Sequence, residues 1–202
     1  MNQHTLEHSN TKHAKTYPAS SNNNIGKSEL IDGRVVSRPA SDRWNNLITS
    51  NFTIAIGSRI TRSSCELYSG NMQVQTAKES ICFPNVVVVN GEPAFADHAS
   101  QLLQNPTVVI EVFSNSAPSL DRTQKLEGFL ATPSIKECLL VNETEMRVEH
   151  YSRQNPKQWI YRIYNERDDV ISLESISCKL SLAEVYAQIK FGDAKLSSRA
   201  VH

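Results

Sequence analysis

Residues 107–113 read TVVIEVF, a β-branched and apolar run that a single carboxylate, Glu111, interrupts. A second run, VVVV at residues 86–89, is apolar throughout. Continuous apolar runs of this length are typical of strands that are buried on both faces of a sheet. The two segments therefore predict the centre of a mixed β-sheet that helices cover on both sides, which is an α/β fold.

The segments on either side of this centre carry the signals of further strands and of covering helices. The pair Asp32-Gly33 predicts a hairpin over residues 29–36, and the polar residues 142–144 predict a second one. Helices are expected from the capping pair Ser41-Asp42 to Gly57, over Ser119–Leu130 and over Leu182–Ile189. Further strands are expected at residues 65–68, 72–75, 85–89, 136–141, 147–151 and 159–164.

Composition divides the chain into one folded domain and two tails. Residues 1–27 are rich in Asn, Ser, Thr and His and show no apolar period. Ordering them would bury too little apolar surface to offset the lost conformational entropy. The sequence predicts a disordered N-terminal tail over residues 1–27, a folded domain over residues 28–191 and a C-terminal tail over residues 192–202.

The balance of charge limits the partners that the surface suits. The chain has 21 Lys and Arg against 21 Asp and Glu, a formal net charge of zero. This argues against a polybasic nucleic-acid coat but not against a local basic groove. The apolar runs are far shorter than the roughly 20 residues that span a bilayer, so we expect a soluble, cytoplasmic protein with no membrane partner. Six basic residues are candidates for a local basic face, and the alternative is that they are ordinary solvated surface charges. They are Lys78, Arg122, Lys125, Lys136, Arg147 and Arg153.

The four cysteines, Cys65, Cys82, Cys138 and Cys178, lie far apart, and no two form a CxxC pair. Zinc ribbons and thioredoxin-type redox sites need such close pairs, so the sequence favours neither. Three of the cysteines stand in apolar or alternating runs, which predicts buried, reduced thiols.

Glu111 is the most informative residue of the chain. A carboxylate that is buried among apolar residues costs several kcal/mol unless a cation, a metal or a hydrogen-bond donor meets it. Asn85 follows Pro84 at the start of the other buried run, and two adjacent strands of this kind bring such side chains together. Hard oxygen ligands in that arrangement are typical of nucleases that use a divalent metal. The alternative is a strand-end carboxylate that faces solvent or pairs with Lys or Arg.

The order and spacing of several short motifs add a family resemblance. The motifs lie at residues 29–36, 83–89, 109–114, 121–125 and 137–141. Together they resemble those of the Uma-two family of restriction-endonuclease-like proteins, in the PD-(D/E)XK nuclease superfamily, with this chain as a divergent member. The resemblance covers residues 29–191 and implies a restriction-endonuclease-like mixed β-sheet that is flanked by helices.

The resemblance also implies where the catalytic lysine lies. In the superfamily this lysine normally stands two residues after the glutamate, where this chain has Phe113. In the Uma-two pattern it lies on the following helix, which implies Lys125. The alternative for Lys125 is a surface i,i+4 pair with Asp121.

A divalent metal and its ligands follow from the same resemblance. Glu111 and Lys125 would be the catalytic residues, and Asn85, Glu111 and Glu29 would hold Mg²⁺ or Mn²⁺, with DNA as the substrate. Glu29 has an alternative as an exposed strand residue.

The chain departs from the family pattern at five positions: Asn85 replaces Asp, Arg34 replaces Glu, Trp44 replaces His, Asn115 replaces Pro and Ala117 replaces Thr. An amide oxygen binds a hard cation but brings no charge. One hypothesis is a Mg²⁺-dependent DNA endonuclease whose metal binding is weak, or absent if the site is degenerate. The alternative is a catalytically inactive module that keeps the nuclease fold and binds DNA or a protein, a second copy of the chain included.

Overall fold

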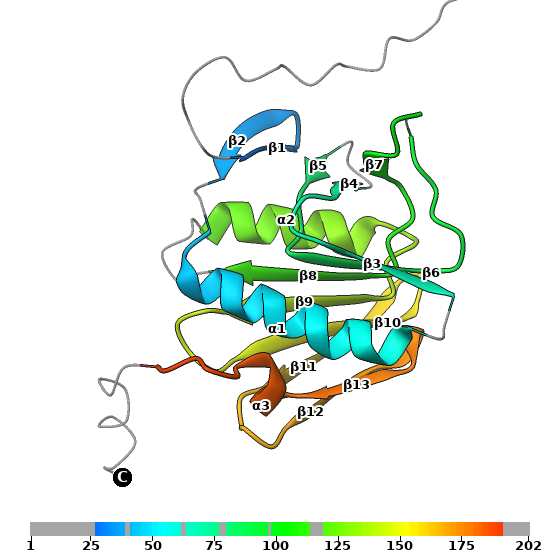
Figure 1. Cartoon of the computed structure of the whole chain (residues 1–202). Coiled ribbons are helices and arrows are strands. Elements are labelled where there is room, and N and C mark those ends of the chain that lie inside the picture. The colour runs from blue at the N-terminus through cyan, green and yellow to red at the C-terminus, as the bar shows by residue number, and fades with distance from the viewer. Residues whose placement is uncertain are drawn as a thin grey trace, which may run out of the picture.

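The computed structural model describes residues 27–38, 41–61, 64–76, 80–96, 98–113 and 119–191. At its centre lies a six-stranded sheet in the order β11–β10–β9–β8–β6–β3 (Figure 1), in which β8 and β9 are parallel and all other neighbours are antiparallel. The two apolar runs are neighbours inside this sheet, as the sequence predicts. The strands are β3 (Cys65–Ser69), β6 (Val86–Asn90), β8 (Val108–Phe113), β9 (Glu137–Asn142), β10 (Val148–Asn155) and β11 (Gln158–Tyr164).

A smaller sheet has the order β2–β1–β5–β4–β7. Its first two strands form the predicted hairpin, and the turn residues Asp32 and Gly33 both have positive φ, 47° and 78°. Glycine adopts this conformation without strain and Asp tolerates it, which is why Asp-Gly specifies such turns. The strands are β1 (Lys27–Ile31), β2 (Arg34–Arg38), β4 (Gln73–Gln75), β5 (Ile81–Cys82) and β7 (Leu102–Leu103).

The longest helix is α1 (Arg43–Ile60), and the Asp42 carboxylate caps it by accepting a hydrogen bond from the Asn45 N–H at 2.9 Å. It continues past the predicted end at Gly57 because its last turn is packed in the core, with Ile60 only 5% exposed. The second helix, α2 (Ser119–Ala131), lies where the sequence predicts it.

The predicted closing helix over Leu182–Ile189 is wrong in length, because α3 (Leu182–Val185) makes a single turn. Tyr186 then enters the core, and its hydroxyl donates to the Asn142 carbonyl at 2.9 Å. Gln188 follows with a φ of +66°, outside the helical region. The hairpin of β12 (Val170–Leu173) and β13 (Cys178–Ser181), joined by the 3₁₀-helix η1 (Glu174–Ile176), is an element that the sequence did not predict.

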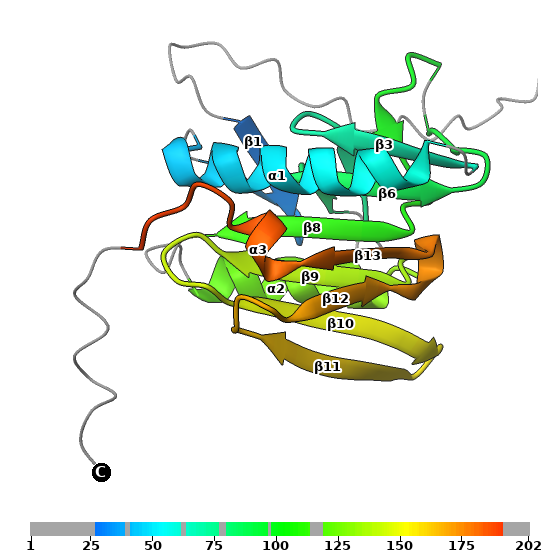
Figure 2. The same ribbon diagram turned by 60° about the horizontal axis from the view of Figure 1, so that its bottom comes forward.

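The six-stranded sheet separates two hydrophobic cores. On one face, Phe52 of α1 packs with Ile110 of β8, together with the β12–β13 hairpin and α3. On the other face, Phe129 of α2 packs with Val109 of β8 and with the small sheet. Figure 2 shows α1, α3 and the hairpin in front of the sheet and α2 behind it. Because successive side chains of a strand point to opposite faces, Glu111 lies on the α2 face.

The structure also bears on the predictions for the cysteines, for membrane spans and for the two tails. Cys82, Cys138 and Cys178 are buried and form no disulfide, as expected of the three in apolar runs, and Cys65 is half-buried and also forms no disulfide. Within the described residues no helix is long and apolar enough to cross a membrane. The two predicted tails, residues 1–27 and 192–202, lie outside the described residues except for Lys27.

Candidate active site

Lys125 bridges two carboxylates that come from different sheets. Its Nζ lies 2.7 Å from Oε1 of Glu111, on β8, and 3.0 Å from Oε1 of Glu29, on β1. All three side chains are largely buried, with exposed fractions of 9% for Lys125, 11% for Glu111 and 4% for Glu29. The buried Glu111 therefore meets a cation, and Lys125 makes this contact from inside the molecule.

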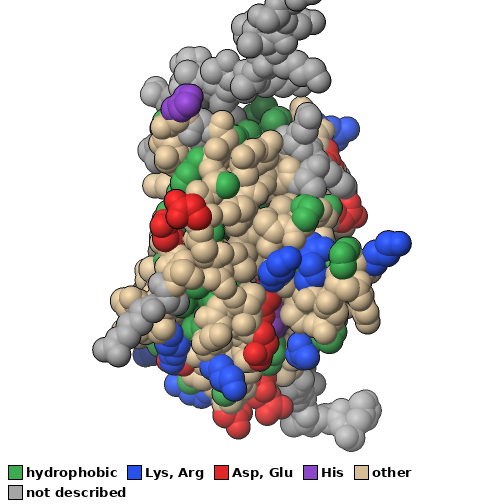
Figure 3. Space-filling model, turned by 90° about the vertical axis from the view of Figure 1, so that its right-hand side faces the viewer, with side chains coloured by type: hydrophobic (Ala, Val, Ile, Leu, Met, Phe, Trp, Pro, Cys, Tyr) green, Lys and Arg blue, Asp and Glu red, His purple; other side chains and the backbone are tan. Residues whose placement is uncertain are grey.

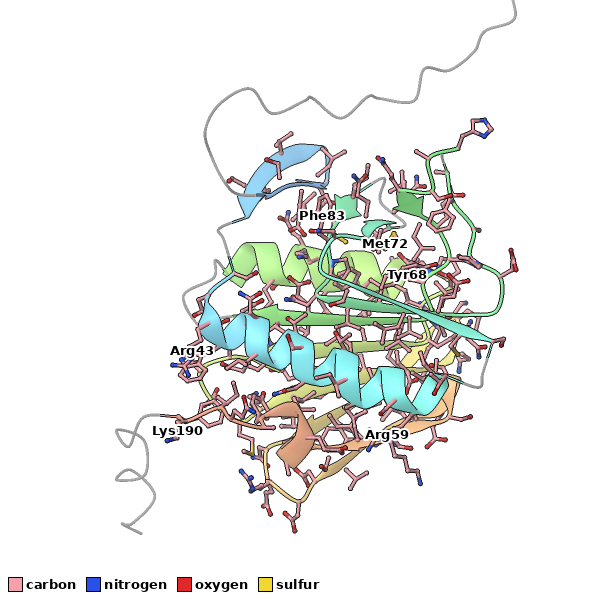
Figure 4. The ribbon with its side chains drawn as sticks, viewed as in Figure 1. Arg43, Arg59, Tyr68, Met72, Phe83 and Lys190 are labelled. Carbon is pink, nitrogen blue, oxygen red and sulfur yellow. The ribbon has the colours of Figure 1, made fainter. Side chains whose placement is uncertain are left out.

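Strand pairing and helix packing bring these three residues together. Leu30 pairs with Ile81, so β1 lies beside β5, and the Phe83 N–H that follows β5 donates to Oε1 of Glu29 at 2.9 Å. Figure 4 shows Phe83 on the side of the small sheet, above α2. Since α2 packs across the same face of the large sheet, Lys125 lies between β8 of that sheet and β1 of the small sheet.

The cluster joins two carboxylates to one ammonium group. Two carboxylates and one ammonium carry a formal net charge of −1. Buried ionic groups are costly unless partners compensate them, and a lysine that is buried between carboxylates is a candidate functional group for that reason.

Asn85 lies at the start of β6, and its side chain is turned toward α1. Its Nδ2 donates to Oδ1 of Asn45 at 2.8 Å and to Oγ1 of Thr49 at 2.9 Å, while its Oδ1 accepts from the Val112 N–H at 2.9 Å. The structure thus brings Glu29, Glu111 and Lys125 into one cluster, and it directs these contacts of Asn85 to the helix on the opposite face. The role of Asn85 as a metal ligand stays a prediction.

Asn45 and Thr49 are site residues that sequence reasoning missed. Asn45 is 8% exposed, and its Nδ2 donates to the Val112 carbonyl at 3.1 Å. A signal was present, because Asn45 stands three residues before Ile48 and seven before Phe52, on the apolar face of the helix. A polar residue at such a position needs a buried partner.

The other departures from the family pattern lie in different surroundings. Arg34 is exposed on β2. Trp44 is half-buried in the first turn of α1, with the Arg43 guanidinium 4.6 Å from the ring centroid. Asn115 and Ala117 lie outside the described residues.

The arginines expected on a basic face are engaged with other groups. Arg122 pairs with Glu149 at 2.8 Å, and Arg147 reaches the same carboxylate at 3.2 Å. Arg153 lies 4.2 Å from the centroid of Trp159 and donates to backbone carbonyls. Lys78 lies outside the described residues. On the face in Figure 3, basic and acidic side chains are interspersed, which suits a small contact surface better than a continuous basic track.

The donors of the cluster fit a hard divalent cation in part. Mg²⁺ is commonly held by one or two carboxylates and completes its shell with water or phosphate oxygens, and Glu29 and Glu111 supply two carboxylates on one side. Within the described residues, no three His, Cys, Asp or Glu side chains lie close enough together to hold an ion. A metal here would therefore be bound by few protein ligands.

A groove of about 480 Å³ lies apart from this cluster. It is lined by Leu67–Ser69, by Asn71–Gln73 and by Ser100 and Gln101. Figure 4 shows Tyr68 and Met72 on this part of the molecule. None of the three cluster residues lines it.

The fold is shared with a protein of known structure. The crystal structure of a protein from Anabaena variabilis ATCC 29413, described as a putative nuclease belonging to DUF820, matches with a TM-score of 0.67. The match covers 79% of this chain and 89% of that chain at 17% identity, so it shows a shared fold.

Sequence comparison gives the family. The model of the Uma2 family, described as "Putative restriction endonuclease", matches residues 14–184, and the chain therefore belongs to this family. The resemblance that the motifs indicate is confirmed, and the match begins inside the predicted N-terminal tail.

Two uncharacterized proteins of Synechocystis sp. (strain PCC 6803) are similar to this chain. Protein sll1609 is 31% identical over 135 residues, which are 66% of this chain and 76% of that protein. Protein slr1290 is 21% identical over 165 residues, which are 82% of this chain and 86% of that protein.

Proposed function

We propose that this nuclease-like protein is a metal-dependent endonuclease that hydrolyses phosphodiester bonds in DNA. The observation that carries the proposal is the buried Lys125 ammonium between the carboxylates of Glu29 and Glu111. Three charged side chains from β1, β8 and α2 share one buried position, where apolar residues of similar volume are often as stable, and this supports a role in chemistry.

Each residue of the cluster has a role in this proposal. Glu29 and Glu111 would hold Mg²⁺ or Mn²⁺, and Asn85 would join them through Oδ1, which also accepts from the Val112 N–H. The metal, when bound, would supply an activated water and stabilise charge on the phosphate. Lys125 carries its ammonium at the same place, where it would orient the attacking water or stabilise the developing negative charge.

A non-catalytic DNA-binding or protein-interaction module is the second candidate, and one observation favours it. The Asn85 amide is bound to Asn45, Thr49 and Val112, which commits to the protein interior a side chain that the metal site would use. A chain that keeps the nuclease fold and loses the metal would bind DNA or a partner without cleaving it.

A plasmid-nicking assay separates the two candidates. Supercoiled DNA is incubated with wild type, Glu111→Gln and Lys125→Met, in Mg²⁺ or Mn²⁺ and in chelator. Wild type should nick only with metal, and each variant should lose about 100-fold or more in rate, the range for removing a charge-stabilising or proton-transferring group.

The matched controls are Glu92→Gln and Lys179→Met, which change the same residue types at exposed positions and should nick at the wild-type rate. If folded wild type leaves the plasmid intact in both metals yet shifts a labelled DNA duplex in fluorescence anisotropy, the second candidate is the correct one.

A further inference from the structure

Asn45, Asn85 and Val112 form a closed ring of three buried hydrogen bonds. The Val112 N–H donates to Oδ1 of Asn85 at 2.9 Å, Nδ2 of Asn85 donates to Oδ1 of Asn45 at 2.8 Å, and Nδ2 of Asn45 donates to the Val112 carbonyl at 3.1 Å. Asn45 and Asn85 are only 8% and 7% exposed. The two amides therefore bind both backbone polar groups of one residue of β8.

The ring replaces strand pairing directly before the first residue of β6. The β6–β8 register runs from Val88↔Val108 to Val86↔Ile110 and stops there. The main chain of Asn85 is engaged elsewhere, since its carbonyl accepts from the Gly70 N–H at 2.9 Å. Two side-chain amides thus satisfy the backbone of Val112, whose buried N–H and C=O need partners.

Val112 directly follows Glu111, and this sets the position of the carboxylate on the other face of the sheet. We propose that Asn45 and Asn85 form an amide clamp that positions Glu111 against Lys125, a proposal that rests on the nuclease function proposed above. Asn45 and Asn85 act through the backbone of β8 and are positioning residues, and Thr49 supports them by accepting from Asn85 and donating to the Asn45 carbonyl at 2.7 Å.

The clamp needs an amide at position 85. An aspartate there keeps an acceptor for the Val112 N–H but has no proton for Asn45 or Thr49, and it brings a carboxylate oxygen against Oδ1 of Asn45. Burying an acceptor against an acceptor costs the full desolvation of both groups. Asn85 is therefore matched to Asn45 in this chain.

The test compares Asn45→Ala with Asn51→Ala. Asn51 is on the same helix and also donates from Nδ2 to backbone carbonyls, those of Val185 and Ala187 at 3.0 Å each, but it does not bind β8. Both variants should lower the melting temperature. Only Asn45→Ala should speed hydrogen exchange of the Val112 N–H and move the side-chain NMR resonance of Lys125, because only this variant releases β8.

Nicking kinetics give the second measurement. Asn45→Ala should lower kcat by about tenfold or more, as expected for a displaced reacting group, with KM for DNA unchanged, whereas Asn51→Ala should keep the wild-type kcat. Equal kcat values and unmoved Val112 and Lys125 signals in the two variants would overturn the clamp. If wild type does not nick DNA, the proposed function fails, and the two NMR signals alone still decide on the clamp.

Asn85→Asp tests the need for an amide. It should lower the melting temperature and should not increase nicking in Mg²⁺ or Mn²⁺. Increased nicking in the folded variant would overturn the clamp and would show that position 85 acts as a metal ligand.

Discussion

Two buried carboxylates lie on opposite faces of the central sheet, and different kinds of donor hold them. Glu137, at the start of β9, accepts from the backbone N–H groups of Glu174 and Ser175 at 3.2 and 3.1 Å, and Nε2 of His150 lies 3.2 Å from the same carboxylate. Glu111 instead lies 2.7 Å from the Lys125 ammonium. Backbone donors are fixed in place, whereas an ammonium on a four-carbon side chain can move.

This difference distinguishes the structural carboxylate Glu137 from Glu111, for which we propose a role in chemistry. Burial raises the pKa of Glu137, but the hydrogen bonds from His150 and Ser175 outweigh it and leave the pKa below its usual value. Glu137 ties η1 and the β12–β13 hairpin to the sheet through these bonds. The Glu111 cluster joins β1, β8 and α2 through one lysine side chain, and Lys125 keeps its contact with Glu29 when Glu111 is lost. We therefore expect loss of Glu137 to affect stability and loss of Glu111 to affect chemistry.

The largest effect on stability should come from Glu137→Ala. The change leaves the donors at His150, Glu174 and Ser175 without their acceptor, and removal of one partner of a buried ionic group costs about 3–5 kcal/mol. Urea unfolding should show this loss in the free energy of unfolding. Glu92→Ala, at an exposed position, is the matched control and should change stability little. A loss below 1 kcal/mol for Glu137→Ala would remove the contrast between the two carboxylates.

The pH dependence of stability should sharpen the contrast. The pKa of Glu137 is lower in the folded state than in the unfolded chain. Its contribution to the free energy of unfolding is therefore complete above the unfolded-state pKa of about 4.3. This contribution is lost as the pH falls through the folded-state pKa of Glu137. Glu137→Gln should therefore be less stable than wild type at pH 7, and the difference should narrow below about pH 4. A difference that stays constant from pH 7 to pH 3, measured by urea unfolding, would contradict this role.

The sequence predicted the parts of the fold that have strong periodic signals. The strands around Val87 and Ile110 were predicted because their runs are apolar throughout, and the hairpin at Asp32-Gly33 because its turn needs positive φ. The β12–β13 hairpin was missed because its connection is a 3₁₀-turn that ends at Ser177, with φ +51°, and not at a Gly or Asn that would mark it. Its pairing therefore depends on contacts with the sheet.

For the candidate site, the sequence indicated the charged residues but not the contacts of the amide. Glu111 was indicated because a carboxylate inside an apolar strand needs a partner, and Lys125 was indicated by the family resemblance. The orientation of Asn85 depends on Asn45, 40 residues earlier in the chain, and no local pattern contains that information. The buried contact between Glu137 and His150 was missed. Each residue stands in a segment whose pattern predicts a strand, but the pattern does not show which face of that strand is buried.

The smallest effect on stability should come from Glu111→Gln, and this variant tests the other side of the comparison. The amide keeps the shape of the side chain and removes one of two carboxylates that share a single ammonium, while Lys125 keeps its bond to Glu29. The free energy of unfolding without metal should therefore change by less than about 1 kcal/mol, the net value of a typical hydrogen bond. A ligand that binds only the folded state raises the melting temperature, so Mg²⁺ or Mn²⁺ should stabilise wild type and Glu92→Gln but not Glu111→Gln. An equal metal-induced shift in all three proteins would show that Glu111 is not a ligand. A loss of stability as large as that of Glu137→Gln would instead make Glu111 a structural carboxylate of the same kind as Glu137.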